Sequence, residues 1–387
     1  MRNSSVGIHT INIFRRYTHK EIDEIRKAFK EYSKTTGSIR IYPTNEAKTC
    51  YRIDYLEKHT GIAYWQIRYS SSYKADYRDY IVEAKINPKI LAGDVDYIRS
   101  SNEGDIPAMI VKFEEEAKKI SKHLRNFSRY RLNRVDYCVN FDLQELGFPC
   151  TPDQMMELIK RSNIPAHYTE YKKYHPVSKR SKSLPGSFYL KSASVVVNSY
   201  GKYDQLLDMY PDNVSIETSQ FVIRFEIQCK YQKIYNMTKI AKKDGVPEYA
   251  VTRHLLSDEV ARMIVYRYFE RIVMGGEYYT LKAATEKIKS RNFRGNKECR
   301  ILSALNLINQ QRSVHAAKES LRQKGDDLTE FNRALHELVD LNINPVTIPK
   351  SFGITRIPNL YAEYTYMERF GVSMLEELES AMKQYKV

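Results

Sequence analysis

The sequence predicts an α/β protein of the α+β kind, in which a largely antiparallel sheet with flanking helices precedes an all-helical region. Several segments before residue 235 alternate apolar and polar residues with the period of two that a half-buried strand requires. Capped helical patterns separate some of these segments, and after about residue 232 only helical patterns remain. We therefore predict a sheet-containing domain at 1–235, a helical connecting region at 236–295 and a C-terminal helical module at 296–387.

The individual elements follow from local signals in chain order. Alternating apolar residues predict strands at 8–13, 51–56, 62–69, 80–86, 131–142, 188–203 and 219–231. Capping boxes, or a proline in the first turn, predict helices that begin near residues 18, 105 and 151. Later helices are predicted at about 255–272, 298–310, 313–323 and 328–341. The last three are compatible with a helix-turn-helix module, although such packing more often provides structural support.

The strand predicted at 131–142 has one apolar face and one unusually polar face. Its apolar side chains are Val135, Tyr137, Val139 and Phe141, and its polar ones are Arg134, Asp136, Cys138, Asn140 and Asp142. Two later strands repeat this pattern, one with Arg224 and Glu226 and one with Asn198, Tyr200 and Lys202. If these strands share a sheet, its polar face holds carboxylates, cations and a tyrosine, and that face is the candidate site.

Carboxylates on neighbouring strands suggest a metal site. Asp136 and Glu226 offer hard oxygen ligands, which suit Mg²⁺ or Mn²⁺, and Asp142 is a further candidate ligand. A divalent ion there would polarise a scissile phosphate and offset charge in the transition state. The alternative is that each carboxylate only pairs with the arginine of its own strand, Arg134 or Arg224.

The charge of the chain indicates its class of partner. A net charge of +15 over 387 residues favours a polyanion, with nucleic acid ahead of a membrane surface. A basic, tyrosine-rich segment suits contact with single-stranded nucleic acid, although it is also compatible with a solvated loop. Its candidate DNA-binding residues are Lys172, Lys173, Lys179, Arg180 and Lys182. Five widely spaced cysteines, no apolar run long enough to span a membrane and no signal-peptide pattern predict a cytoplasmic protein.

Tyr200 is a candidate nucleophile. A phenol is a poor nucleophile at its free pKa of about 10. Lys202 or an adjacent metal ion could stabilise the phenolate and so activate it. Attack on a phosphodiester would conserve the bond energy as a phosphotyrosine link, which suits an enzyme that must rejoin DNA. With 31 tyrosines in the chain, the residue type alone does not single out a nucleophile.

Three short motifs resemble those of the replication initiators of rolling-circle plasmids of the pT181 type, the Rep_trans family. They are also similar to the related gene II-type replication proteins of phages and plasmids. The motifs are Arg134-Val-Asp136, Asn198-Ser-Tyr-Gly-Lys202 and Arg224-Phe-Glu226, with Asn87-Pro88-Lys89 as a further shared element. Two departures are Asn198, where the family has a basic residue, and Lys85, where a glutamate is expected and Glu83 lies two residues earlier.

This resemblance implies a site-specific DNA nickase and ligase that starts rolling-circle replication. Tyr200 would be the nucleophile, a carboxylate-bound Mg²⁺ or Mn²⁺ the cofactor, and Arg134, Arg224 and Lys202 the residues that hold phosphates near the cut. The partners implied are origin DNA, as duplex and single strand, together with the host helicase and polymerase, and homodimerisation stays open. The alternatives are a relaxase of a mobile or conjugative element with the same chemistry, and a non-catalytic origin-binding protein.

Overall fold

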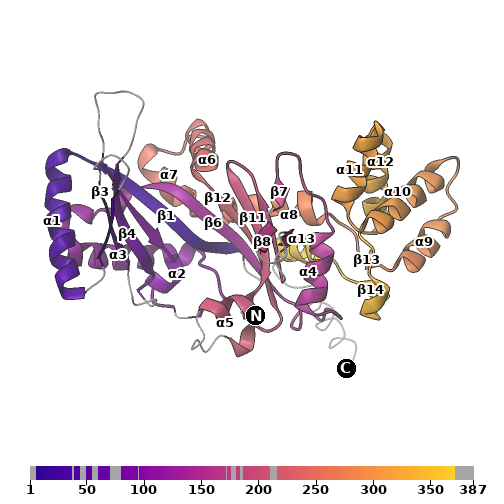
Figure 1. Cartoon of the computed structure of the whole chain (residues 1–387), viewed down its shortest axis with the longest axis horizontal. Coiled ribbons are helices and arrows are strands. Elements are labelled where there is room, and N and C mark those ends of the chain that lie inside the picture. The colour runs from indigo at the N-terminus through magenta and orange to yellow at the C-terminus, as the bar shows by residue number, and fades with distance from the viewer. Residues whose placement is uncertain are drawn as a thin grey trace.

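A ten-stranded antiparallel sheet lies at the centre of the protein (Figure 1). The computed structural model describes residues 6–36, 39–43, 49–54, 60–69, 80–94, 96–170, 172–175, 180–183, 186–209 and 216–370. The strand order is β2-β3-β4-β5-β1-β6-β12-β11-β10-β7, and each pair of neighbours is antiparallel. The predicted antiparallel sheet is therefore confirmed.

The strands fall close to the ranges that alternation predicted. The sheet consists of β1 Gly7–Tyr17, β2 Ile39–Pro43, β3 Thr49–Asp54, β4 Ile62–Tyr69, β5 Tyr80–Ile86, β6 Arg131–Asp142, β7 Thr169–Glu170, β10 Ser187–Lys191, β11 Val195–Gly201 and β12 Val222–Cys229. A separate hairpin pairs β8 Lys172–His175 with β9 Arg180–Ser183. The order matters for function, because it makes β1, β6, β12 and β11 consecutive neighbours.

Helices flank the sheet and continue to the end of the described chain. They are α1 His19–Thr36, α2 Pro88–Leu91, α3 Ile106–Ile120, α4 Pro152–Lys160, α5 Lys202–Met209, α6 Tyr231–Lys243, α7 Val251–His254, α8 Asp258–Val273, α9 Leu281–Lys289, α10 Lys297–Gln311, α11 Val314–Lys324, α12 Thr329–Asp340 and α13 Leu360–Phe370. Capping explains two of the starts. Thr18 and Glu21 exchange hydrogen bonds before α1, and Thr151 and Gln154 do so at α4.

One face of the sheet is buried against helices. At one end, Trp65 of β4 packs on Phe113 of α3, with ring centroids 5.3 Å apart. Towards the other end, Phe225 of β12 packs on Phe269 of α8 at 4.8 Å. Burying these large rings removes much apolar surface from water and provides the main driving force for the fold. Because side chains alternate along each strand, the polar residues of the same strands face the opposite side.

The region after residue 232 is helical with one exception. A short pair, β13 Tyr278–Tyr279 with β14 Arg356–Ile357, interrupts the predicted helix-only pattern. Gly276 adopts a φ of +81°, and a Cβ there would lie 2.4 Å from the backbone carbon of Ile343. Only glycine permits this close approach, so Gly276 allows the chain to turn after α8 ends. Among the described residues, no helix is long and apolar enough to cross a membrane.

Candidate active site

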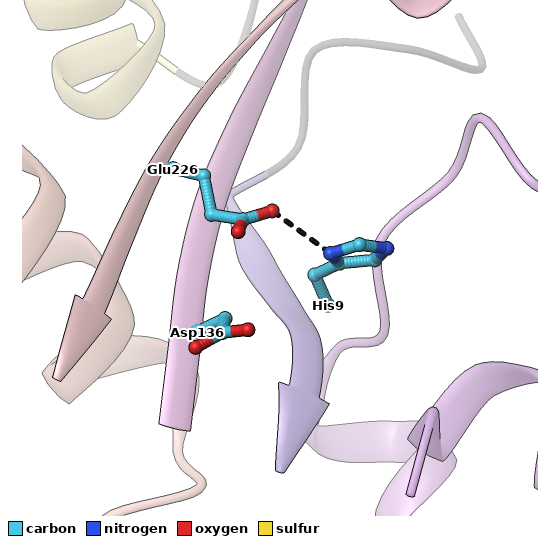
Figure 2. Close-up of side chains that lie close together, drawn as sticks. All are labelled: His9, Asp136 and Glu226. Atoms are coloured by element: carbon cyan, nitrogen blue, oxygen red, sulfur yellow. Dashed lines mark hydrogen bonds and ion pairs between the residues drawn. The ribbon is translucent and has the colours of Figure 1, made fainter. Parts of the chain in front are cut away.

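Four adjacent strands each contribute one polar side chain to the same place on the open face. Asp136 of β6 lies opposite Gln228 of β12 in the register, so Glu226 is its diagonal neighbour on the same face. Ligand atoms of His9, Asp136 and Glu226 all lie within 4.8 Å of one another (Figure 2). The diagonal continues to Tyr200 of β11, whose hydroxyl donates to Oε2 of Glu226 at 3.2 Å. The structure therefore places these two carboxylates and this tyrosine next to one another, which is the grouping that the alternation of side chains predicts.

His9 joins the group because β1 contains a bulge. Ile8 is the partner of Tyr137 and Thr10 is the partner of Asp136, so His9 is an extra residue with no partner on β6. A bulge of this kind redirects a side chain and is frequent beside active sites. Sequence reasoning missed this residue. The one trace in the sequence is the interval of three between buried Ile8 and Ile11, where an unbroken strand would have an interval of two.

The charges of the group are unevenly distributed. Burial lowers the pKa of His9 to about 4, so its imidazole is neutral near pH 7. Although burial opposes it, the neighbouring His9 and the cations Arg224 and Arg134 hold the pKa of Glu226 at about 2. Burial, together with the charge of Glu226, raises the pKa of Asp136 to about 7. Without a cation, Nδ1 of His9 donates to Oε2 of Glu226 at 2.8 Å (Figure 2). The neutral imidazole can instead carry its proton on Nε2, and this tautomer frees the Nδ1 lone pair for a cation.

These residues fit a divalent cation. Two carboxylates of like charge are buried close together, and the neutral imidazole beside them cannot neutralise either one. A bound cation would remove this repulsion, and the three side chains offer oxygen and nitrogen ligands on one side. Imidazole is a softer ligand than carboxylate, so the set favours Mn²⁺ over Mg²⁺ more than a carboxylate-only site would.

Tyr200 is almost fully buried, and its phenol stays protonated in this arrangement. Burial, and then the charge of Glu226, raises the pKa of Tyr200 well above its ordinary value. Arg224 lies opposite Tyr200 in the pairing of β11 with β12, and its positive charge opposes this rise in the pKa of Tyr200. The Nζ atom of Lys202 lies 6.0 Å from the centroid of the Tyr200 ring. Activation of this phenol therefore depends on added positive charge near Glu226.

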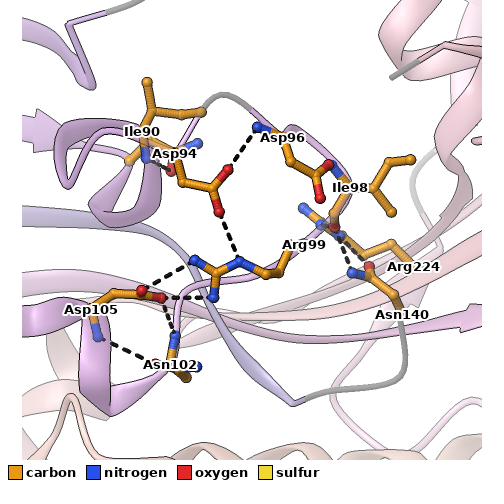
Figure 3. Close-up of polar contacts among 10 residues, drawn as sticks. Ile90, Asp94, Asp96, Ile98, Arg99, Asn102, Asp105, Asn140 and Arg224 are labelled. Carbon is orange, nitrogen blue, oxygen red and sulfur yellow. Dashed lines mark hydrogen bonds and ion pairs between the residues drawn. The ribbon is translucent and has the colours of Figure 1, made fainter. Parts of the chain in front are cut away.

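The two arginines of the motifs lie in different environments. Arg134 is partly exposed and makes two hydrogen bonds to Asp136, at 2.8 and 2.6 Å, so it also orients this carboxylate. Arg224 is fully buried, and it donates to Oδ1 of Asn140 at 2.7 Å and to the carbonyl oxygen of Ile98 (Figure 3). In this conformation Arg224 contacts the protein, whereas Arg134 lies beside the open face.

The segment that carries Ile98 is anchored at both ends. Arg99 binds Asp94 at 2.8 Å and Asp105 at 3.0 Å, and Figure 3 shows these contacts around the carbonyl that Arg224 uses. Ser101 also pairs with Ile8 at the start of β1. The strand that carries His9 and the arginine beside Tyr200 are therefore held by the same loop.

Three further predicted residues are not part of the candidate metal-binding group. Lys202 was expected on the strand face, but β11 ends at Gly201, and Lys202 begins α5, where it is buried and donates to Gln205 at 2.7 Å. Asp142 lies at the far end of β6, where its Oδ1 accepts from the amides of residues 144 and 145. Asn198 is the direct partner of Glu226, and its Oδ1 has no hydrogen-bond partner among the described residues.

The predicted basic segment folds in part as a hairpin. Lys173 of β8 pairs with Lys182 of β9, and His175 pairs with Arg180. Lys172 is in the same hairpin, opposite Ser183, and Lys179 lies outside the described residues.

An open pocket of about 480 Å³ gives access to Tyr200. His9, Tyr200 and Glu226 lie along it, together with Tyr189 of β10 and residues of α5. The nucleophile candidate and two of the three candidate metal ligands therefore border one cavity that a substrate can enter.

Comparisons with known proteins add little to this geometry. No protein-family model and no curated protein matches the chain. Among solved structures, it is similar to one described as the rolling circle replication initiator protein from Geobacillus stearothermophilus, at 11% identity and a TM-score of 0.30. The similarity covers 69% of this chain and 85% of that chain. At this TM-score the likeness supports no conclusion about fold or function.

Proposed function

We propose that this protein nicks and rejoins one strand of DNA at a specific origin, with Tyr200 as nucleophile, and so initiates rolling-circle replication. The observation that carries the proposal is the 3.2 Å hydrogen bond from Tyr200 to Glu226, a carboxylate of the His9–Asp136–Glu226 group. A phenol beside a metal-binding group, in a pocket open to substrate, has the arrangement that covalent attack on a phosphodiester requires.

The proposed reaction is a transfer between two oxygen atoms. The phenolic oxygen of Tyr200 attacks the phosphorus, the bond from phosphorus to the 3′-oxygen breaks, and a 5′-phosphotyrosine link forms. Tyr200 loses its phenolic proton to water in the open pocket that it borders, and the 3′-oxygen takes up one proton. The free 3′-hydroxyl primes synthesis, and its attack on the phosphotyrosine reverses the reaction and rejoins the strand. A divalent cation held by His9, Asp136 and Glu226 would polarise the phosphate and offset its charge.

Other residues are assigned by their position. Arg134 lies at the open face beside Asp136, and Asn198 lines the pocket next to Glu226, so both are proposed to contact DNA near the cut. Arg224 and Lys202 are buried beside Tyr200, which supports a role in stabilising charge on the phenolic oxygen. The basic residues of the β8–β9 hairpin and Lys179 are proposed to bind the DNA backbone, and the host helicase and polymerase to act on the nicked product.

The test is whether protein becomes covalently joined to DNA. Supercoiled plasmid carrying the origin, incubated with protein and Mn²⁺ or Mg²⁺, should give open circles with protein on the 5′-end, seen on a denaturing gel. EDTA should abolish both products. Nicking without an adduct would mean that water is the nucleophile, and binding without nicking would leave a non-catalytic origin-binding protein. Adduct formation on a transfer origin, and not on a replication origin, would indicate a relaxase of a mobile element.

A further inference from the structure

A second pocket lies where β12 ends and α6 begins, away from Tyr200. It has a volume of about 160 Å³. Three aromatic rings line it, those of Phe14, Tyr231 and Tyr235. Polar groups of the lining come from Arg131, Thr238, Lys242, Glu248 and Thr252, and aliphatic side chains from Leu132, Ile234, Val251 and Leu255. The active-site proposal uses none of these residues.

The tyrosines of this pocket are not part of the core. Tyr231 and Tyr235 are one helical turn apart on α6 and are 53% and 44% exposed, whereas the core side of α6 carries Ile234, Met237 and Ala241. Their rings stack at 6.3 Å with an interplanar angle of 22°, and Phe14 meets Tyr231 edge-on at 6.5 Å. Two exposed, stacked phenol rings provide a flat apolar surface to which another planar ring can add.

Cations surround these rings. The Nζ atom of Lys239 lies 4.6 Å from the centroid of the Tyr235 ring. Arg131 and Lys242 both pair with Glu248 at the pocket, the former at 3.2 Å. Basic side chains interleaved with exposed aromatic rings are the combination that binds single-stranded nucleic acid, because phosphates meet the cations and bases stack on the rings.

The same three strands connect this pocket to the candidate active site. His9 and Phe14 lie on β1, Asp136 and Arg131 on β6, and Glu226 precedes Tyr231 by five residues at the end of β12. Five residues of strand span about 16 Å. β1 and β12 both run antiparallel to β6, so all three lead from the metal-binding group in one direction. Figure 1 agrees, because α6 and α5 lie at opposite ends of these strands.

The polar face reaches the pocket. Phe14 is the register partner of Glu83, which belongs to the same face as Asp136. Residues 131–134 of β6 lie beyond the last residue pair that β6 makes with β12, so β12 leaves this part of β6 uncovered. α6 begins where β12 ends, beside these residues. A DNA strand that lies on the open face can therefore extend from Tyr200, past Arg134, to Tyr231.

We propose that this pocket binds one unstacked base of the single-stranded DNA that flanks the nick. This inference rests on the nicking function proposed above and adds the site that holds the substrate strand. The volume supports a single ring system, since a protein cavity of about 150 Å³ accommodates benzene. An apolar side chain of a partner protein would also fit the volume, but the three cations around the rings outnumber the one carboxylate, Glu248, and this excess of positive charge favours an anionic strand.

The test measures binding alone and does not depend on nicking. Protein in EDTA, carrying Tyr200→Phe so that no cut can occur, is titrated with a fluorescent oligothymidylate and with a strand of the same length made of abasic sites. Tyr231→Ala should weaken oligothymidylate binding about tenfold, whereas Tyr231→Phe keeps the ring and should change it less than about twofold. Tyr231→Ala should bind the abasic strand as the parent does, because its phosphates are unchanged.

Tyr249→Ala is the matched control, since Tyr249 is 80% exposed nearby and does not line the pocket. It should leave both affinities unchanged. Equal loss on both strands would show that Tyr231 acts through the phosphates and would overturn the base pocket. Unchanged binding in both Tyr231→Ala and Tyr235→Ala would also overturn it and leave the pocket as a docking point for a protein. Neither result would bear on the covalent adduct of Tyr200, so the two proposals fail separately.

Discussion

Two buried carboxylates on the same polar face have opposite surroundings. Glu83 of β5 accepts hydrogen bonds from Asn12, Tyr64 and Asn133, each at 3.1 Å, and pairs with Arg68. Within the described part of the chain, Glu226 of β12 accepts only from the neutral groups of His9 and Tyr200.

This difference separates a structural carboxylate from a reactive one. Glu83 has four donors, one of them a cation, and needs nothing further. Glu226 lies beside a second buried carboxylate, Asp136, which pairs with Arg134, and an added cation between the two carboxylates would reduce the repulsion that remains. Burial alone therefore does not identify the candidate site. What identifies it is a buried carboxyl group, Asp136, whose pKa is raised to about 7 by burial and by the charge of Glu226, close to a phenol that borders an open pocket.

The largest effect should come from Tyr200, the phenol that donates to Glu226 and borders the open pocket. Tyr200→Phe removes one oxygen atom, so folding and origin binding should persist, while nicking falls by about three orders of magnitude or more. Denaturing gels with 5′-labelled origin strands should show an adduct for wild type and none for the variant. Tyr189→Phe, in the same pocket, is the control and should keep the adduct. An adduct that vanishes with Tyr189 and persists without the Tyr200 hydroxyl would reassign the nucleophile.

The next effect should come from the carboxylates themselves. Asp136→Asn and Glu226→Gln keep shape and remove charge, so metal-dependent nicking should fall by about two orders of magnitude. The measurement is the initial rate of nicking across a Mn²⁺ titration. Glu83→Gln is the control from the same face and should keep wild-type rates per folded molecule. If all three variants nick alike, the comparison drawn here is wrong.

Removing metal should change stability in a pH-dependent way. The pKa of Asp136 is about 7 in the folded, metal-free protein, so folding favours the protonated form of this carboxyl group. The stability that this protonation contributes is fully present below about pH 4 and is lost as the pH rises to 7. A bound cation requires the ionised carboxylate of Asp136, so cation binding restores the stability that is lost as the pH rises. Mn²⁺ at a hundred times its Kd should stabilise the protein by about 3 kcal/mol near pH 8 and by less near pH 6. Thermal shifts with and without Mn²⁺ measure this, and Asp136→Asn should lose the pH dependence.

The smallest effect should come from Glu83. Glu83→Gln removes the ion pair with Arg68 and leaves one of its buried donors facing an amide N–H, so unfolding free energy should fall by about 1–3 kcal/mol. Urea denaturation would measure it. A folded variant that had lost nicking would place Glu83 within the active site.

Much of this arrangement could be predicted from alternation. The period of two in β6 and β12 placed Asp136 and Glu226 on one face, because side chains in a strand must alternate. The location of the Lys202 side chain could not be predicted in this way, because β11 ends one residue before Lys202 and the chain continues as helix α5. Asp142 satisfies the loop that follows it, and alternation says nothing about such local hydrogen bonds.

Because of the bulge at His9, the residue at this position can change the metal preference of the candidate site without changing the fold. Because residue 9 has no partner in the ladder, its side chain can be exchanged without moving a core residue or altering the register of β1 and β6. An oxygen donor there would give a harder ligand set, which shifts preference towards Mg²⁺, and an apolar residue would leave two carboxylates with no third ligand. The residue at position 9, in the bulge of β1, would therefore set which ion the candidate site prefers, and an insertion of one residue is enough to create such a bulge.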